Sequence, residues 1–144
     1  MNTSFNQLSK YLEQEPDKTC FILKNNKVIF TSEKKGVKPM IDYYSNYGTS
    51  SEPLIVVDRI MGKGAVVLAI FIGANHVVTP VVSQLALDFA NSKNIRIDYN
   101  KVVPYIINRT KDGQCPIETA VADIDSVDEG YEVIRETLLE LNND

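Results

Sequence analysis

Residues 54–83 read LIVVDRIMGKGAVVLAIFIGANHVVTPVVS, and this stretch decides the fold class. It predicts a buried strand over Leu54–Val57, a helix from about Arg59 to Gly73, and a second strand over Val77–Val82. The helical part is apolar nearly all round, which is typical of a helix in the middle of a fold. Polar residues interrupt the uncharged stretch from Gly64 to Leu87, so we expect a buried helix and strand there and no membrane span.

The segments on either side of this unit carry further signals for helices and strands. Capping residues and helix-starting prolines predict helices that begin near Ser4, Pro39, Ser83, Pro116 and Ser126. The Asn25-Asn26 pair predicts a hairpin over Thr19–Thr31. Alternating residues predict a strand over Ile95–Tyr99, and Val102–Ile107 is expected to form a separate edge strand because it contains Pro104.

This order of elements predicts an α/β protein, a three-layer α/β/α sandwich with a mixed sheet. A chain of 144 residues fits one domain, so we expect residues 1–144 to form a single unit. The expected inward faces are Val37, Met40, Ile41 and Tyr44 in the second helix, and Val127, Tyr131, Ile134, Leu138 and Leu141 in the last.

Charge and cysteine content limit the expected partners and compartment. The chain has 15 basic and 19 acidic residues, a net charge of −4, so we expect no nucleic-acid partner. The first residues lack a secretory signal pattern, which predicts a cytoplasmic protein with reduced thiols. Of the two cysteines, Cys20 is expected in the core of the hairpin. The single histidine, His76, is expected at the surface or satisfied by hydrogen bonds.

The first candidate for chemistry is the turn from Asp58 to Gly64, between the first buried strand and the apolar helix. Asp58 is placed to cap that helix, and Gly62 and Gly64 let a ligand approach the backbone at a helix N-terminus, which attracts anions. Lys63 opposes the helix dipole beside an apolar segment, so a bound anion would compensate its charge. The alternative interpretation is a lysine that extends toward the surface next to two packing glycines.

The second candidate is the segment from Asn108 to Glu118. Pro116 suits the first helical position, which puts Cys115 at the N-cap, where a thiol ionises more easily. Glu118 falls at the third helical position, where a carboxylate caps the helix or takes a proton, and Arg109 could hold a carboxylate or phosphate. The alternative interpretation is a structural helix start with Cys115 as a small buried filler.

Three segments together resemble a known family. They are the Asp58–Gly64 turn with its apolar helix, Thr79-Pro80-Val81-Val82-Ser83 before a helix, and Asn108-Arg109 followed by Gly113-Gln114-Cys115-Pro116-Ile117-Glu118. On these residues the chain resembles the domain-of-unknown-function 1893 family over nearly its whole length. That family is placed in the cytidine-deaminase-like superfamily, so the resemblance implies a cytidine-deaminase-like fold.

The chain departs from true deaminases at the zinc ligands. Zinc deaminases use a His or Cys with a Glu at the start of one helix, and Pro-Cys-x-x-Cys at the start of the next. Here the first place falls near Asp58–Lys63, which holds no His or Cys, and in the second a valine follows Pro80. We therefore expect no metal site, and the sequence points to no other cofactor.

Two functions remain open. The first is a pocket for a small anionic or nucleotide-like molecule, with Asp58, Gly62, Gly64, Asn108 and Arg109 as ligand-binding residues. In this hypothesis the candidate catalytic residues are Cys115, as a nucleophile or redox-sensitive contact, together with Lys63 and Glu118. The alternative is a non-catalytic ligand-sensing or protein-interaction module. The sequence leaves open the identity of the ligand, whether the protein is an enzyme, and whether it forms a homo-oligomer.

Overall fold

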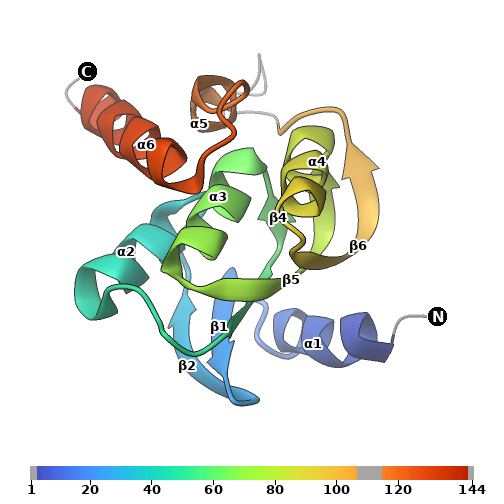
Figure 1. Cartoon of the computed structure of the whole chain (residues 1–144). Helices are drawn as coiled ribbons and strands as arrows, with labels where there is room; N and C mark the ends of the chain where they lie inside the picture. The colour runs from blue at the N-terminus through green and yellow to red at the C-terminus, as the bar shows by residue number, and fades with distance from the viewer. Residues whose placement is uncertain (1–2, 107–114, 143–144) are drawn as a thin grey trace.

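A computed structural model describes residues 3–106 and 115–142, and within them the chain forms a mixed α/β fold of six helices and six strands (Figure 1). The helices are α1 (Thr3–Gln14), α2 (Lys38–Tyr47), α3 (Lys63–Ile72), α4 (Gln84–Ser92), α5 (Pro116–Ala120) and α6 (Val127–Asn142). The strands are β1 (Cys20–Lys24), β2 (Lys27–Ser32), β3 (Leu54–Asp58), β4 (Ile60–Met61), β5 (Ala74–Ser83) and β6 (Arg96–Val103). The predicted α/β class is confirmed.

The strands form one mixed sheet centred on β5. β3 pairs with the first half of β5 and β4 with the second half, both in parallel, while β6 runs parallel along the opposite edge of β5. β1 pairs antiparallel with both β3 and β2, so β2 ends the sheet on that side. The parallel strands are joined through α3 and α4, as strands in parallel need a crossover connection.

Helices cover both faces of the sheet (Figure 1). α1 packs on one face, where Leu12 meets Phe21, Leu23, Val57 and Val78 in a small core. The other five helices lie on the opposite face around α3, which contacts α2, α4, α5 and α6. Neighbouring residues of β1 and β3 alternate between these two cores because successive side chains of a strand point to opposite faces.

The hairpin forms at the residues that the sequence indicates. Asn25 and Asn26 both adopt positive φ, 53° and 65°, as the two central residues of a tight hairpin turn require. Ile22 of β1 pairs with Phe30 and Leu23 with Val28, so Ile29 has no partner in β1 and forms a bulge.

Several expected boundaries and faces are corrected. α3 begins at Lys63 and not near Arg59, because the residues just before it form β4, which pairs with Val81 and Val82 of β5. The separate strand expected from Val102 does not form; Val102 and Val103 extend β6, which ends before Pro104 because proline has no N–H to donate.

Two inward faces also differ from expectation. In α2, Tyr43 is buried, while the predicted Ile41 and Tyr44 are half-buried, because Tyr43 packs edge-on against Phe30 of β2. In α6, Leu141 is exposed at the outer end of the helix. No helix in residues 3–106 and 115–142 is both long and apolar enough to cross a membrane.

Arg59 fixes the end of α1 against the sheet. Its guanidinium donates to the backbone oxygens of Leu12, Glu15 and Pro16, and its Nε donates to that of Lys18 over 2.8 Å. These oxygens lie at and after the last turn of α1, where a helix leaves carbonyl groups without partners. Arg59 therefore serves as the C-terminal cap of α1.

The turn geometry yields a test of the hairpin. Asn26→Ala should lower the free energy of unfolding by about 1 kcal/mol, because a Cβ without a polar side chain disfavours positive φ. Asn26→Gly should leave it within about 0.5 kcal/mol of wild type, since glycine adopts this conformation freely. Urea unfolding measures both variants. Equal stability of the two would show that the turn does not depend on positive φ at this position.

Candidate functional site

The site is built around the carboxylate of Glu118, which is 2% exposed. Its Oε2 accepts from the backbone N–H of Lys63 over 2.7 Å and from the hydroxyl of Ser83 over 2.5 Å. Its Oε1 accepts from the backbone N–H of Ile106 over 2.9 Å. One side chain of α5 thus joins the starts of α3 and α4 to the segment after β6.

The starts of α3 and α4 use this carboxylate in different ways. The N-cap of α3 is Gly62, which has no side chain to accept a hydrogen bond, so Glu118 caps this helix from a distant part of the chain. Ser83 caps α4 as predicted, since its Oγ accepts from the N–H of Ala86 over 3.1 Å. The same hydroxyl donates to Glu118, which fixes its orientation.

Lys63 is buried, with 5% of its surface exposed. Its Nζ donates to the backbone oxygen of Ala122 over 3.0 Å and lies 5.3 Å from the centre of the Phe89 ring. Burial lowers the pKa of the ammonium group, and the charges of Asp125, Asp123 and Glu118 oppose this shift. The lysine therefore ties α3 to the end of α5 and to α4.

The two glycines of the turn allow the chain to pack against itself. A Cβ at Gly62 would lie 2.8 Å from Oε2 of Glu118, and one at Gly64 would lie 2.5 Å from Cγ2 of Ile117. Both distances are too short for a real contact. The two glycines therefore allow α5 to approach the first turn of α3 closely.

Cys115 occupies the predicted N-cap position of α5, and its backbone N–H donates to the oxygen of Ile106 over 2.8 Å. The thiol makes no capping hydrogen bond, and the residue is half-buried against the main core. The predicted ligand-binding residues Asn108 and Arg109 lie outside the described residues.

Asp58 makes its contacts away from this junction. It ends β3 opposite Cys20 of β1, and its Oδ1 accepts from the N–H of Arg59 over 2.7 Å, so it does not cap α3 as expected. Its Oδ2 is buried and has no hydrogen-bond partner in the described part of the chain. Burial raises the pKa of this carboxyl group well above its usual range, although Arg59 and the N–H of Ile60 act against the shift.

The two remaining residues considered from the sequence, Cys20 and His76, make contacts within the protein. Cys20 is fully buried as predicted, and burial followed by the charge of Asp58 raises the pKa of its thiol. His76 is satisfied as predicted, because its Nε2 lies 2.7 Å from Oδ2 of Asp98. Across residues 3–106 and 115–142, no three His, Cys, Asp or Glu side chains gather as a metal-binding group.

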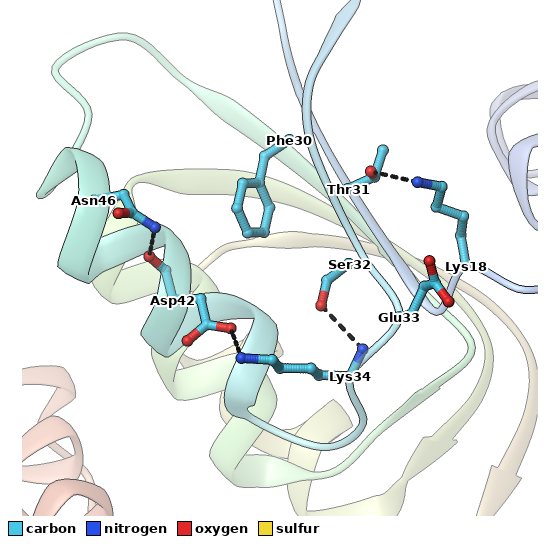
Figure 2. Close-up of a pocket in the computed structure, with 8 residues that line it drawn as sticks. All are labelled: Lys18, Phe30, Thr31, Ser32, Glu33, Lys34, Asp42 and Asn46. Atoms are coloured by element: carbon cyan, nitrogen blue, oxygen red, sulfur yellow. Dashed lines mark hydrogen bonds and ion pairs between the residues drawn. The ribbon is translucent and has the colours of Figure 1, made fainter.

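The sequence hypothesis placed Lys63 and both glycines in one candidate segment and Glu118 in the other, in a single pocket that also included Asp58. The structure brings the first four together, while Asp58 makes its contacts elsewhere. It missed the bond between Ser83 and Glu118. Capping patterns in the sequence indicate each helix start separately. A hydrogen bond between one helix start and a residue 35 positions away leaves no local pattern in the sequence. Surface hollows lie elsewhere: one is lined by Phe30 and residues 31–34 (Figure 2), and another by Tyr43, Tyr47 and residues 49–51.

The comparisons with known proteins support the resemblance drawn from the sequence. The sequence model of the family described as Domain of unknown function (DUF1893) matches residues 7–138. The crystal structure of a DUF1893 family protein, TM1506 from Thermotoga maritima, is similar with a TM-score of 0.78. The alignment covers 97% of this chain and 92% of that one at 21% identity, which shows a shared fold alone. No curated protein sequence matches the chain.

The three hydrogen bonds of Glu118 predict a large stability effect. Glu118→Gln should lower the free energy of unfolding by about 2–4 kcal/mol, because the amide NH₂ must face at least one backbone N–H that now donates to the carboxylate. Urea denaturation measures this loss. Glu13→Gln, at an exposed position of α1, is the matched control and should change it by less than about 0.5 kcal/mol. A loss below about 1 kcal/mol at Glu118 would contradict the junction.

Asp58 predicts a pH dependence of stability. The pKa of Asp58 in the folded state lies above the unfolded value of about 3.9. The native protein therefore holds this proton more tightly than the unfolded chain does. The resulting stabilisation is complete below that unfolded value and is lost as pH rises through the folded pKa.

Asp58→Asn cannot ionise, so this part of the decline in unfolding free energy should vanish in the variant. Urea unfolding of both proteins at a series of pH values upward from about 4 tests this. Asp128→Asn, at an exposed position, controls for the loss of one negative charge. Parallel profiles for wild type and Asp58→Asn would show that Asp58 titrates normally.

Proposed function

We propose that this chain, which belongs to the family described as Domain of unknown function (DUF1893), is a non-catalytic binding module in which the candidate catalytic residues Glu118 and Lys63 hold the fold together. The observation that carries this proposal is the position of Glu118. Its carboxylate fills the place at the start of α3 where an external anion would bind. The backbone N–H that this turn could offer to a ligand is therefore already bound within the protein.

General acid–base catalysis requires a group that reaches the substrate and exchanges a proton with it. Glu118 is buried, and both of its oxygens accept hydrogen bonds from the protein. Lys63 is buried as well, and its ammonium group is directed to a backbone oxygen of the chain. Neither side chain is presented to a bound molecule in this arrangement.

The proposal includes a cytidine-deaminase-like fold without a zinc site. The mixed sheet with helices on both faces supports it, as does the valine that follows Pro80 in place of a zinc-ligating cysteine. We also place the protein in the cytoplasm, where its two unpaired thiols would stay reduced.

The alternative is a pocket for a small anionic or nucleotide-like ligand with Cys115 as its nucleophile. It requires a thiol activated well beyond that of an ordinary cysteine. Comparison with Cys20 cannot decide this, because Cys20 is fully buried and its thiol has a raised pKa. The reference must be the same thiol without the fold.

Alkylation of Cys115 therefore tests the proposed function. At pH 7 its rate with iodoacetamide, followed by mass spectrometry, should be no more than about threefold above that of an unfolded peptide spanning residues 112–118. Cys20→Ser provides a protein in which Cys115 is the single thiol. A rate more than about tenfold above the peptide would overturn the non-catalytic proposal in favour of the alternative.

A further inference from the structure

We propose that the hollow between β2, the end of α2 and residues 49–51 binds a small molecule in which a flat ring carries a negatively charged group. This inference rests on the proposed binding function and names its site and ligand class. The hollow has a volume of about 430 Å³ and is lined by Lys24, Ile29, Tyr43, Tyr47 and residues 49–51. None of these residues belongs to the junction around Glu118.

Two tyrosine rings and an isoleucine form the apolar part of the hollow. The ring centres of Tyr43 and Tyr47 lie 5.1 Å apart at 42°, and Tyr47 is 63% exposed. Ile29 is the bulged residue of β2, and 40% of its surface remains exposed. An exposed ring beside a branched apolar side chain is suited to contact with the face of a second ring.

Lys24 supplies the positive charge of the hollow. Tyr43 lines the hollow with 4% of its surface exposed, and its hydroxyl is the polar group of its side chain. Burial raises the pKa of this hydroxyl and Tyr47 raises it further, so it stays protonated as a donor near neutral pH. Lys24 forms no ion pair with any carboxylate in the described ranges. A ligand with a negative charge would supply the missing partner.

The walls of the hollow are fixed before any ligand binds. Ser50 donates its N–H to the oxygen of Ile72 and its hydroxyl to the oxygen of Glu52. A Cβ at Gly73 would lie 2.9 Å from the oxygen of Ser50, which shows how closely this loop packs on the end of α3. Asn25 of the hairpin donates to Glu52 over 2.9 Å. A preformed site lowers the entropy cost of binding.

A hollow lined by Phe30, Lys18 and Lys34 differs because its charged and polar groups bind one another (Figure 2). There Lys34 pairs with Asp42 over 2.7 Å, and Lys18 donates to the hydroxyl of Thr31. Asn46 donates to the backbone oxygen of Asp42. Because its charged and polar groups bind one another, that hollow offers a ligand less than the one at Tyr43.

The test uses four probes on the full chain. Benzoate and phenyl phosphate carry the ring with two kinds of anion, benzamide carries the ring without charge, and acetate carries the charge without the ring. Nuclear magnetic resonance titration of the ¹⁵N-labelled protein should show saturable shifts at residues 24, 29, 43, 47 and 49–51 with a ring anion. We expect dissociation constants of about 1 mM, at least fivefold tighter than for benzamide or acetate.

Matched variants separate the contribution of the Lys24 charge to binding from that of the Tyr47 ring. Lys24→Met should remove the preference for benzoate over benzamide, and Tyr47→Ala should weaken both by at least threefold. Lys27→Met changes an exposed lysine of the same hairpin outside the hollow and should leave binding unchanged. Absence of saturable shifts up to about 20 mM, shifts confined to other residues, or equal losses in Lys24→Met and Lys27→Met would each overturn the inference.

This result is separable from the test of the proposed function. Saturable benzoate binding together with fast alkylation of Cys115 would overturn the non-catalytic proposal alone. Slow alkylation without binding at the hollow would overturn the ligand site and leave the non-catalytic proposal standing.

Discussion

The structure depends on one buried carboxylate that three segments share. Glu118 accepts hydrogen bonds from the start of α3, from the cap of α4 and from Ile106 in the segment after β6. A buried carboxylate is costly unless its oxygens are satisfied, and here each oxygen has a donor. Because α3 lies at the centre of its layer, fixing its start also sets the surfaces on which α2, α4 and α6 pack.

The same interaction explains why a group of residues that is typical of an active site need not form an active site. Glycines and a lysine gathered at a helix start are the components of an anion site, and here an acid, Glu118, lies among them. In this chain the acid is itself the anion, and Ile117 occupies the space that Gly64 opens. The surface that we propose for binding lies instead beside the β1–β2 hairpin, where Lys24 forms no ion pair with the described residues.

Local chemistry was sufficient to predict most of the elements. Asparagines that accept positive φ located the hairpin, and Ser83 and Pro116 located the starts of α4 and α5. Prediction failed where a pairing between distant segments overrides local preference. β4 forms because Ile60 and Met61 meet Val81 and Val82, and Tyr43 is buried because Phe30 lies opposite it. For the candidate site, the residues were predictable but their mutual hydrogen bonds were not.

The contact between Gly62 and Glu118 couples the evolution of two positions that lie far apart in the sequence. A side chain at position 62 would meet both the carboxylate and Ile106, so a larger residue there requires, among other shifts, that the acid at position 118 become shorter or turn away. Turning away would in turn leave the N–H of Lys63 without its acceptor. Substitutions at the two sites are therefore expected to be accepted as pairs, and a change at either one alone would be selected against through the stability of the whole domain.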